Sequence, residues 1–588
     1  MAFNSYKEDE KVSTIKKTVT LGRLLKYLLK YKQQLIAVFA ILAYCTAVGL
    51  INPLFLESAI DDYILPKNFR GLAILLAIAL LLNTIWVVLV KIRMQLMAKV
   101  SNDAVRRIRE EVFTKLQQLE LTYFDSRPTG KILSRVMDDV NSMKGVLEQL
   151  VLTLLPEIIT LVATATIMLL KEPRLALAGM VGVPILLVGI FTIEKINRVR
   201  WQINRKKSAN LNAFIHEDVS GIRIVKTFAA ENETQDTFDE LNTEAKNSFI
   251  HAVRVSDAYS SIIEISMSLS MICMFAVGIK VIGPDELSVG LIVAFITYVS
   301  LFWQPISNLG DFYNQIIRSV AAAERVFEVI DEVPAIRDSE NAHDLPEVKG
   351  RVNFEKVCFA YEDDVPVLNN VSFEVKPGET IALVGPTGAG KTTIVNLISR
   401  FYDTKSGKVL IDGNDVKEVK LEGLRSQLGI MTQDNFLFTG TIKDNIRYGK
   451  LDATDEEIIA AAKVVNAHEF ITKLEKGYDT ELTERGGGLS IGQKQLIAFA
   501  RTILSAPKIL ILDEATSSID TKNELMVQAG IEAILQNRTS FVVAHRLSTI
   551  RRADRIFVIR DGIIAEEGNH DTLMAKKGIY YDLHMAQA

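Results

Sequence analysis

The chain has 588 residues, more than one hydrophobic core normally supports, so we expect at least two domains. Its formal net charge of −4 and the absence of a basic stripe argue against nucleic acid as a partner. Three scattered cysteines, Cys45, Cys273 and Cys358, are too few for a disulfide framework or a zinc site. Apolar runs crowd the first half of the chain, so we expect one domain to lie in a membrane.

The N-terminal segment MAFNSYKEDEKVSTIKKTVT has no apolar core followed by small residues, so no cleaved signal peptide is predicted. Six later segments are long and apolar enough to cross about 30 Å of hydrocarbon as helices. They are Leu35–Leu56, Leu72–Ile92, Leu150–Leu170, Leu175–Ile193, Tyr259–Ile282 and Val289–Ile306. These segments predict a polytopic α-helical membrane domain.

The gaps between the six segments alternate in length. The first, third and fifth gaps are short, whereas the second and fourth are long and have the pattern of charged amphipathic helix. Lys and Arg concentrate in the two long gaps and in the N-terminal RLLKYLLKYK. The positive-inside rule therefore places the long gaps and both termini in the cytoplasm.

Each long gap contains a short interruption of its helical pattern, FDSRPTGKILSR at Phe124–Arg135 and HEDVSGIRIVKTF at His216–Phe228. Pro and Gly in the middle of a long helical pattern indicate a reversal of the chain. We expect the two reversals to be contact points for a cytoplasmic domain; the alternative is that they are ordinary solvated loops.

The pattern changes after the sixth span. An acidic segment punctuated by Pro is followed by short β-rich runs, and then by helices alternating with buried strands. We therefore expect a transmembrane domain at 1–325, a linker at 326–350 and an α/β domain with a largely parallel core at 351–588.

GPTGAGKTT follows the apolar strand IALV and precedes the helical IVNLISRFY, which is the strand, loop and helix context of a P-loop. Glycines let the backbone turn so that its N–H groups converge on phosphate oxygens. Lys391 is expected to neutralise the β- and γ-phosphates, and the Thr392 hydroxyl to ligate Mg²⁺. The predicted ATP-binding loop comprises Gly385, Pro386, Thr387, Gly388, Ala389, Gly390, Lys391, Thr392 and Thr393.

KILILDEATSSID supplies a second element, a buried strand that ends in two acidic residues. Ligands in open α/β sheets lie at the carboxyl ends of strands. Asp513 suits a contact with Mg²⁺ through water, and Glu514 is positioned to polarise the water that attacks the γ-phosphate.

LSIGQ, from Leu489 through Ser490, Ile491 and Gly492 to Gln493, lies between these two motifs. With it, the second half resembles an ATP-binding-cassette (ABC) ATPase, and the six spans with two long gaps resemble an ABC exporter half-transporter. The resemblance implies an α-helical membrane domain followed by a P-loop ATPase domain of the ABC type.

The resemblance also implies roles for single residues. Tyr361 matches the aromatic that stacks on adenine, Gln433 the glutamine that reaches Mg²⁺ and the attacking water, and His545 the histidine that grips the γ-phosphate. Asp520 matches the loop that touches the opposite ATPase domain. Residues expected to couple the ATPase to the membrane domain are Arg127, Lys131, Ser220, Arg223 and Glu484.

In this family two ATPase domains hold two ATP molecules, each between one P-loop and the other domain's signature helix. The resemblance implies ATP-driven export of a small hydrophobic or amphipathic molecule, such as a drug, lipid or peptide, across a cell membrane. The alternative is an ATP-gated channel or regulatory subunit that performs no pumping. A pump shows ATPase activity that transported compounds alter, and a channel passes current on binding alone.

Ile491 departs from the family's usual Leu-Ser-Gly-Gly-Gln signature. Its branched side chain lies where close approach to the other subunit favours glycine. This asymmetry resembles heterodimeric exporters, so we expect a second, different half-transporter as partner. A homodimer that tolerates Ile491 is the alternative.

Two acidic residues interrupt the apolar spans, Glu157 in TLLPEIITL and Glu264 in SSIIEISMS. Ionisable groups in a membrane are costly, so they are candidates for function. If they line the cavity they favour cationic or amphipathic cargo, and if they pair across helices they hold the bundle together.

Overall fold

The computed structural model describes residues 17–282, 287–362, 365–432, 435–513, 521–543 and 547–587. The described chain folds into two compact units. The helical unit holds residues 17–116 and 130–331, and the α/β unit holds residues 117–129 and 332–587. The short segment 117–129, which lies between two membrane helices in the sequence, thus belongs to the α/β unit.

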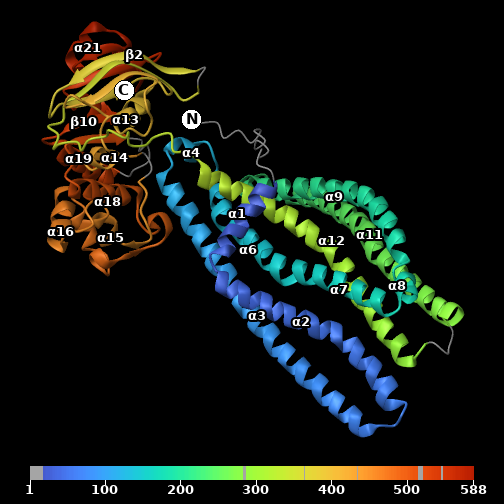
Figure 1. Cartoon of the computed structure of the whole chain (residues 1–588). Coiled ribbons are helices and arrows are strands. Elements are labelled where there is room, and N and C mark those ends of the chain that lie inside the picture. The colour runs from blue at the N-terminus through green and yellow to red at the C-terminus, as the bar shows by residue number, and fades with distance from the viewer. Residues whose placement is uncertain are drawn as a thin grey trace. The chain divides into compact units, whose positions relative to one another are not determined.

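The helical unit consists of long helices that reverse at short turns (Figure 1). Its α-helices are α1 (Lys17–Leu29), α2 (Lys32–Ser58), α3 (Phe69–Gln118), α5 (Thr129–Ser134), α6 (Val140–Gln149), α7 (Leu155–Lys171), α8 (Pro173–Gly179), α9 (Gly182–Ser220), α10 (Ile222–Phe228), α11 (Glu231–Val277) and α12 (Val289–Asp331). Short π-helical segments continue several of them, at Ala59–Ile64, Arg135–Asp139, Leu150–Leu154 and Gly278–Ile282.

Six helical stretches of the described chain are long and apolar enough to span a membrane. They are Lys32–Ile64, Phe69–Gln118, Thr129–Lys171, Pro173–Ser220, Glu231–Ile282 and Val289–Asn308. Each contains one of the six spans predicted from the sequence, so the expected number and order of spans are confirmed. The helices of the two long gaps continue directly from the spans, because no helix-breaking residue separates the apolar part from the charged part.

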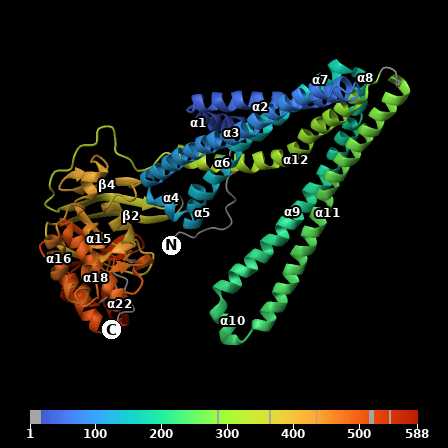
Figure 2. The same ribbon diagram turned by 90° about the horizontal axis from the view of Figure 1, so that it is seen from below.

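Both predicted reversals are present. In the first long gap the chain forms α4 (Leu121–Asp125) and turns at Pro128 before α5 begins. In the second, α9 ends at Ser220, and α10 forms the tip between α9 and α11 (Figure 2).

A ladder of polar pairs holds α9 against α11 beyond the apolar part of the two helices. The Lys207 ammonium lies 2.6 Å from a Glu244 carboxylate oxygen, and the Ser248 hydroxyl donates to Asn204 Oδ1 at 3.1 Å. The Trp201 indole N–H donates to the Ser256 hydroxyl at 2.9 Å. Polar pairs replace apolar packing here because this stretch carries too many charges for an apolar seam.

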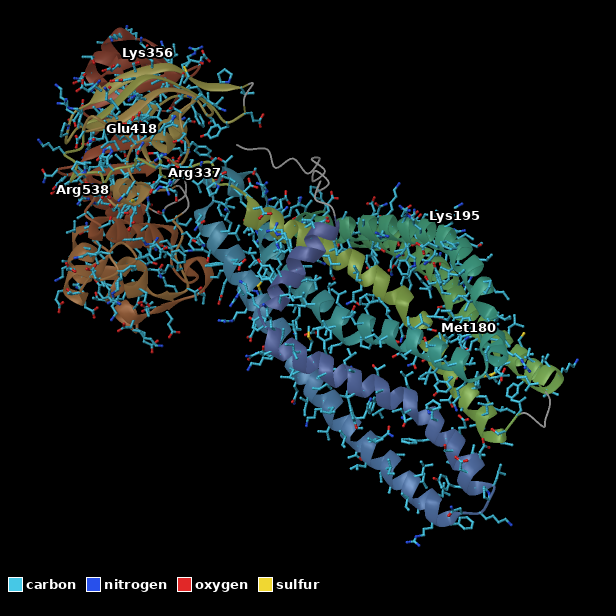
Figure 3. All side chains as sticks on the ribbon, viewed as in Figure 1. Met180, Lys195, Arg337, Lys356, Glu418 and Arg538 are labelled. Atoms are coloured by element: carbon cyan, nitrogen blue, oxygen red, sulfur yellow. The ribbon has the colours of Figure 1, made fainter. Side chains whose placement is uncertain are left out.

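The apolar core of the helical unit gathers around α12 and contains Phe295, Tyr298 and Trp303. Met274 of α11 is buried in this core, and Met267 and Met271 of the same helix pack against it. Figure 3 labels Met180, at the turn before α9, and Lys195 further along that helix. Met180 packs against the core, whereas Lys195 is exposed.

The α/β unit contains α4 and, after Glu332, two main sheets with their helices. The strands are β1 (Val352–Ala360), β2 (Pro366–Val375), β3 (Thr380–Val384), β4 (Ser406–Ile411), β5 (Asn414–Asp415), β6 (Leu428–Met431), β7 (Gly440–Thr441), β8 (Glu481–Leu482), β9 (Ile509–Asp513), β10 (Thr539–Val543), β11 (Arg555–Arg560) and β12 (Ile563–Gly568). The helices are α13 (Lys391–Ile398), α14 (Leu421–Arg425), α15 (Ile442–Arg447), α16 (Asp455–Val464), α17 (His468–Ile471), α18 (Ile491–Leu504), α19 (Thr521–Leu535), α20 (Leu547–Arg552), α21 (His570–Lys576) and α22 (Ile579–Gln587).

The larger sheet has the strand order β12-β11-β3-β10-β9-β6 and is parallel except for β12. Its central strands β3, β10 and β9 are mostly apolar and almost entirely buried, because both faces are covered. Ile381 and Leu383 of β3 face a core shared with the smaller antiparallel sheet and α13. Ala382 and Val384 face a second core built with α15, α16, α18 and α19. The expected α/β fold with a β-rich opening and a largely parallel core is confirmed.

The last helix of the helical unit is longer than the composition predicted. α12 continues through Asp331, where the division between the units falls, so its last turns occupy the start of the expected linker. Acidic residues are compatible with helix as well as with a linker, and the Arg23 guanidinium binds the Asp331 carboxylate, with one N–O distance of 2.9 Å.

Candidate nucleotide site

The segment from Gly385 to Gly390 forms a tight loop between β3 and α13. Gly388 and Gly390 have φ of +84° and +104°, a region that glycine adopts at little cost. A Cβ at Gly390 would also lie 2.8 Å from Leu368 Cδ2, so this position requires glycine for space as well. The loop therefore has the backbone that a phosphate-binding turn needs, and it leads into the N-terminus of α13.

Lys391 is the first residue of α13 and is buried, with 7% of its surface exposed. Its ammonium donates to the carbonyl oxygens of Gly385 at 2.8 Å and Pro386 at 2.9 Å. Burial lowers the pKa of Lys391, and the charge of Asp513 opposes that shift. The loop thus folds around its own cation and holds it next to Pro386, Thr387 and Gly388, which are exposed.

The parallel register brings the second acidic element to the same edge of the sheet. Leu383 of β3 pairs with Val543 of β10, and Val543 pairs with Asp513 of β9. The three residues form one row across the sheet. This row lies where the three strands end, and the P-loop follows β3 there. Asp513 is therefore close enough to Lys391 to influence its titration.

The oxygen donors at this edge suit a hard cation. Thr392 is exposed in the first turn of α13, and Asp513 is partly exposed at the end of β9. Hydroxyl and carboxylate oxygens, directly or through water, are the ligands that Mg²⁺ prefers. The residues present therefore fit a magnesium ion bound together with a nucleotide.

Tyr361 follows β1 and has 47% of its surface exposed. Its hydroxyl lies 3.2 Å from Thr393 Oγ1, which places the ring beside the P-loop helix. A ring exposed at this position can stack on a nucleobase. The partner that supports this ring was not predicted from the sequence: it is Tyr402, whose ring meets Tyr361 edge to face with centroids 5.0 Å apart.

The signature motif opens α18. Ser490 is the N-cap: its hydroxyl oxygen accepts from the Gln493 N–H at 3.3 Å, and Gln493 Oε1 accepts from the Ser490 N–H at 3.0 Å. Gly492 is buried, whereas Ile491 has 54% of its surface exposed. The helix begins normally despite Ile491, and the isoleucine side chain points away from the core of its own unit.

Arg501, three turns along α18, fixes this helix to the segment that follows β6. Its guanidinium donates to the carbonyl oxygens of Asn445 at 2.9 Å and Phe436 at 3.1 Å. Asn445 in turn bonds the backbone of Phe438 and Thr441. Burial lowers the pKa of Arg501. This clamp was not predicted from the sequence, since its partners are mostly backbone atoms.

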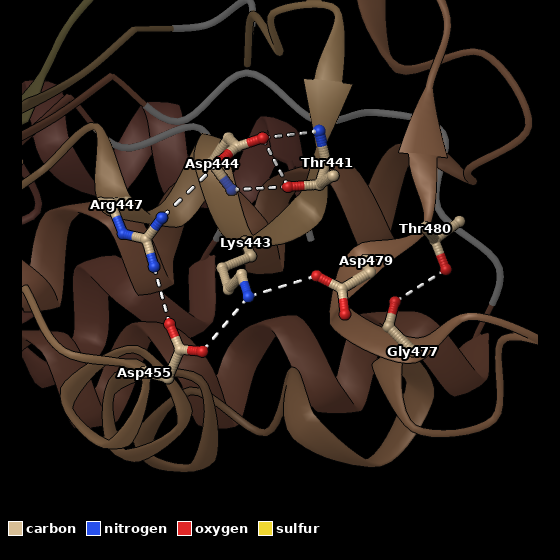
Figure 4. A network of polar contacts seen from close by, with 8 residues as sticks. All are labelled: Thr441, Lys443, Asp444, Arg447, Asp455, Gly477, Asp479 and Thr480. Atoms are coloured by element: carbon tan, nitrogen blue, oxygen red, sulfur yellow. Dashed lines mark hydrogen bonds and ion pairs between the residues drawn. The ribbon is translucent and has the colours of Figure 1, made fainter.

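A polar network on the surface holds the short pair β7 and β8 that precedes the signature (Figure 4). Lys443 lies 3.2 Å from carboxylate oxygens of both Asp455 and Asp479, and the two carboxylates raise its pKa. Thr441 and Asp444 form a capping box that starts α15. The network fixes the start of the segment that leads to Glu484 and Ser490.

Four residues of the predicted site lie outside the described residues: Gln433, Glu514, Asp520 and His545. The strands that precede two of them are described. Glu514 follows Asp513 directly, and His545 comes two residues after Val543, so both follow strands of the row that ends beside the P-loop.

The predicted coupling residues lie at the two reversals and before the signature. Arg127 belongs to the α/β unit, where its guanidinium lies 4.1 Å from the Tyr123 ring centroid. Lys131 is an exposed residue of α5 in the helical unit, and Ser220 and Arg223 are exposed at the end of α9 and in α10. Glu484 is exposed in a short 3₁₀ turn.

The two acidic residues of the spans have different surroundings. Glu157 is partly buried on α7, and its Oε1 accepts from the Asn308 amide of α12 at 2.7 Å. Glu264 is exposed on α11. Glu157 therefore links two helices through a neutral partner, which leaves its charge uncompensated by that bond.

Comparison with known families accounts for both units. Residues 35–306 match the family model described as ABC transporter transmembrane region, and residues 368–517 match the model described as ABC transporter. The chain is 39% identical over 584 residues to the uncharacterized ABC transporter ATP-binding protein YknV of Bacillus subtilis (strain 168), covering 99% of this chain and 97% of that protein. It is 36% identical over 572 residues to the ATP-dependent lipid A-core flippase of Syntrophus aciditrophicus (strain SB), covering 96% and 94%.

A solved structure of a bacterial Atm1-family ABC exporter with ATP bound has the same fold, with a TM-score of 0.79. It is 31% identical, and the match covers 95% of this chain and 98% of that chain. The chain therefore belongs to the ABC transporter family, as an exporter half-transporter that is an ATP-hydrolysing, multi-pass membrane protein. Half-transporters of this kind act as dimers.

Replacing Lys391 with Met tests the nucleotide site. The change removes the buried cation and keeps the length of the side chain, so we expect ATP affinity to fall about 10- to 100-fold, the worth of one hydrogen bond to a charged group. Titration with a fluorescent ATP analogue measures it. Lys463→Met, an exposed lysine of α16, should leave affinity unchanged. Affinity within twofold of the unmodified chain for Lys391→Met would contradict the assignment.

Proposed function

We propose that this half-transporter pairs with a second, different half-transporter and exports a small hydrophobic or amphipathic molecule by alternating access. The observation that carries the proposal is the loop around the buried Lys391 in a chain with six spans. The lipid A-core flippase among the relatives supports an amphipathic substrate for this chain.

The residues around Lys391 have proposed roles in ATP binding or hydrolysis. The loop N–H groups and the Lys391 ammonium bind the phosphates, the exposed Tyr361 ring stacks on adenine, and Thr392, Gln433 and Asp513 would hold Mg²⁺, Asp513 through water. The ion supplies charge neutralisation at the phosphate oxygens.

Two further residues act on the γ-phosphate and its attacking water. Glu514 polarises the water, and His545 grips the γ-phosphate. Asp520 contacts the opposite ATPase domain.

Ser490 can contribute to the ATP bound by the partner while it caps its own helix. Its hydroxyl oxygen accepts from the Gln493 N–H, so its O–H proton is available to a phosphate oxygen. The N-terminus of α18 adds its partial positive charge. Ile491, with more than half of its surface exposed next to Ser490, adds bulk where the partner's nucleotide surface must approach.

We propose the orientation that the basic residues favour. The long helical extensions and both termini lie in the cytoplasm of a cell whose plasma membrane holds the protein. Closure of two ATPase units then draws the reversals near Arg127–Lys131 and Ser220–Arg223 together and opens the cavity outward, and Glu484 contributes to that coupling.

The first test concerns the motor. Glu514→Gln keeps the size of the side chain and removes its basicity, so ATP should bind with unchanged affinity while turnover falls about 100-fold or more. ATP affinity and phosphate release are measured on the same sample, with Glu532→Gln on α19 as the control. Near-normal hydrolysis by Glu514→Gln in the assembled transporter removes Glu514 from this role.

The second test concerns cargo. If Glu157 and Glu264 line the cavity, Glu157→Gln and Glu264→Gln should each raise the half-stimulating concentration of a cationic amphiphile about 2- to 5-fold, the worth of a partly exposed ion pair. Stimulation by a neutral amphiphile of the same size should be unchanged. Glu240→Gln, an exposed residue of α11, is the matched control. If the half-stimulating concentration rises equally for cationic and neutral compounds, the two carboxylates do not recognise the charge of the cargo.

The third test concerns the partner. We expect the chain purified alone to lack full, cargo-responsive ATPase activity, because a homodimer would carry Ile491 at both interfaces. In the assembled pair, Ile491→Gly should change nucleotide trapping at the partner's site about tenfold and leave the site built on Lys391 unchanged. A stable homodimer with full activity and two equivalent sites would overturn the heterodimer.

A further inference from the structure

Three aromatic rings form a cluster beside the nucleotide site. Phe359 meets Tyr361 edge to face at 4.8 Å between centroids, Tyr361 meets Tyr402 at 5.0 Å, and Phe359 meets Tyr402 at 5.7 Å. Tyr361 has about half of its surface exposed, and Tyr402 and Phe359 contact its ring. A base that stacks on Tyr361 would therefore contact a ring that is itself in contact with Tyr402.

The other end of Tyr402 reaches a segment far away in the sequence. Its hydroxyl donates to Asp125 Oδ2 at 2.5 Å, and the Thr122 hydroxyl also bonds the Tyr402 oxygen. Burial and the Asp125 carboxylate raise the pKa of Tyr402, so the hydroxyl stays protonated and remains a donor at physiological pH. Thr122 and Asp125 lie one turn apart on α4, on the same face of that helix.

α4 is fastened at both of its ends within the α/β unit. The Glu120 carboxylate, at its N-cap, accepts from the Ala335 N–H at 3.0 Å, just after the chain leaves α12. Asp125, its last residue, is the end that Tyr402 holds. Along the chain, α4 connects α3 to α5.

The other side chains at the Asp125 end are mostly exposed. Thr122, Phe124, Asp125 and Ser126 are exposed, and the Arg127 guanidinium binds the Ser126 hydroxyl and the Tyr123 carbonyl locally. The buried anchor of α4 is Tyr123, with 3% of its surface exposed. In the described part of the chain, the Tyr402 side chain connects this end to the aromatic cluster beside the nucleotide site.

We propose that Tyr402 is a positioning residue that transmits nucleotide binding from Tyr361 to α4 through its hydrogen bond to Asp125. Stacking of a base immobilises the Tyr361 ring, which restricts the ring of Tyr402 and orders the hydroxyl toward Asp125. This inference rests on the proposal that ATP binds at Lys391 with its base on Tyr361.

Amide hydrogen exchange on the full-length chain in lipid nanodiscs tests the inference, with a non-hydrolysable ATP analogue and Mg²⁺ as the probe. We expect the analogue to slow exchange about 5-fold or more both in the P-loop and in α4 of the unmodified chain. Tyr402→Phe, which removes only the hydroxyl and keeps the ring, should retain the slowing in the P-loop and lose it in α4. Tyr448→Phe, an exposed tyrosine of the same unit, should retain both.

Asp125 variants separate positioning from a merely structural role. Asp125→Ala should lose the nucleotide-dependent slowing in α4, and Asp125→Asn, whose amide oxygen still accepts from Tyr402, should recover it at least in part. The double variant Tyr402→Phe with Asp125→Ala should lose no more of the nucleotide-dependent slowing in α4 than either single variant. Both substitutions break the same hydrogen bond, so their effects should not add.

The outcomes are distinguishable. Slowing in α4 that persists in Tyr402→Phe, or that is absent from the unmodified chain while its P-loop is protected, overturns the role of Tyr402. Absence of protection in the P-loop of the unmodified chain overturns the ATP site itself.

Discussion

The parallel pairing of β3, β10 and β9 is the constraint on which the functional site depends. The register sets Leu383, Val543 and Asp513 in one row, so β3, β10 and β9 end at the same edge of the sheet. Carbonyl groups of the loop that follows β3 then hold Lys391, close enough to Asp513 for the two charges to interact. Two apolar cores, one on each face, keep the strands in this register.

Polar bonds complement the two apolar cores of the α/β unit. α18 carries the signature on its N-terminus, and Arg501 and the Lys443 network fix its position against β7 and β8. Capping boxes at Ser490 and Thr441 define where α18 and α15 begin. These bonds, together with the apolar core that α18 shares with the sheet, hold the helix so that Ser490 and Ile491 are exposed at its N-terminus.

Much of this architecture follows from patterns in the sequence. Span length and apolarity predicted the six membrane helices, and Pro and Gly predicted both reversals, because these signals act over one element at a time. The P-loop was recognisable because its glycines, Lys391 and Thr392 must keep a fixed spacing. The roles of Glu514, His545, Gln433 and Asp520 stay predictions that rest on the family resemblance.

Bonds between distant segments were not predictable. Those from Tyr402 to Asp125, from Asn308 to Glu157 and from Arg501 to Phe436 join residues whose approach depends on the whole fold. Glu157 is an example. The sequence shows a charged residue in an apolar span, where burial is costly, but only the fold reveals that the Asn308 amide of α12 donates a hydrogen bond to it. The continuation of α12 through Asp331 was likewise hidden, since acidic residues suit a linker and a helix equally.

The central claim is that hydrolysis at the site around Lys391 drives a molecule across the membrane in one direction. Sealed proteoliposomes that contain the assembled transporter test it, with ATP and Mg²⁺ added only outside and a self-quenching cationic amphiphile followed in the lumen. We predict accumulation above the outside concentration with ATP and none with a non-hydrolysable analogue. Hydrolysis without accumulation, or flow down the gradient with the analogue alone, would contradict a pump.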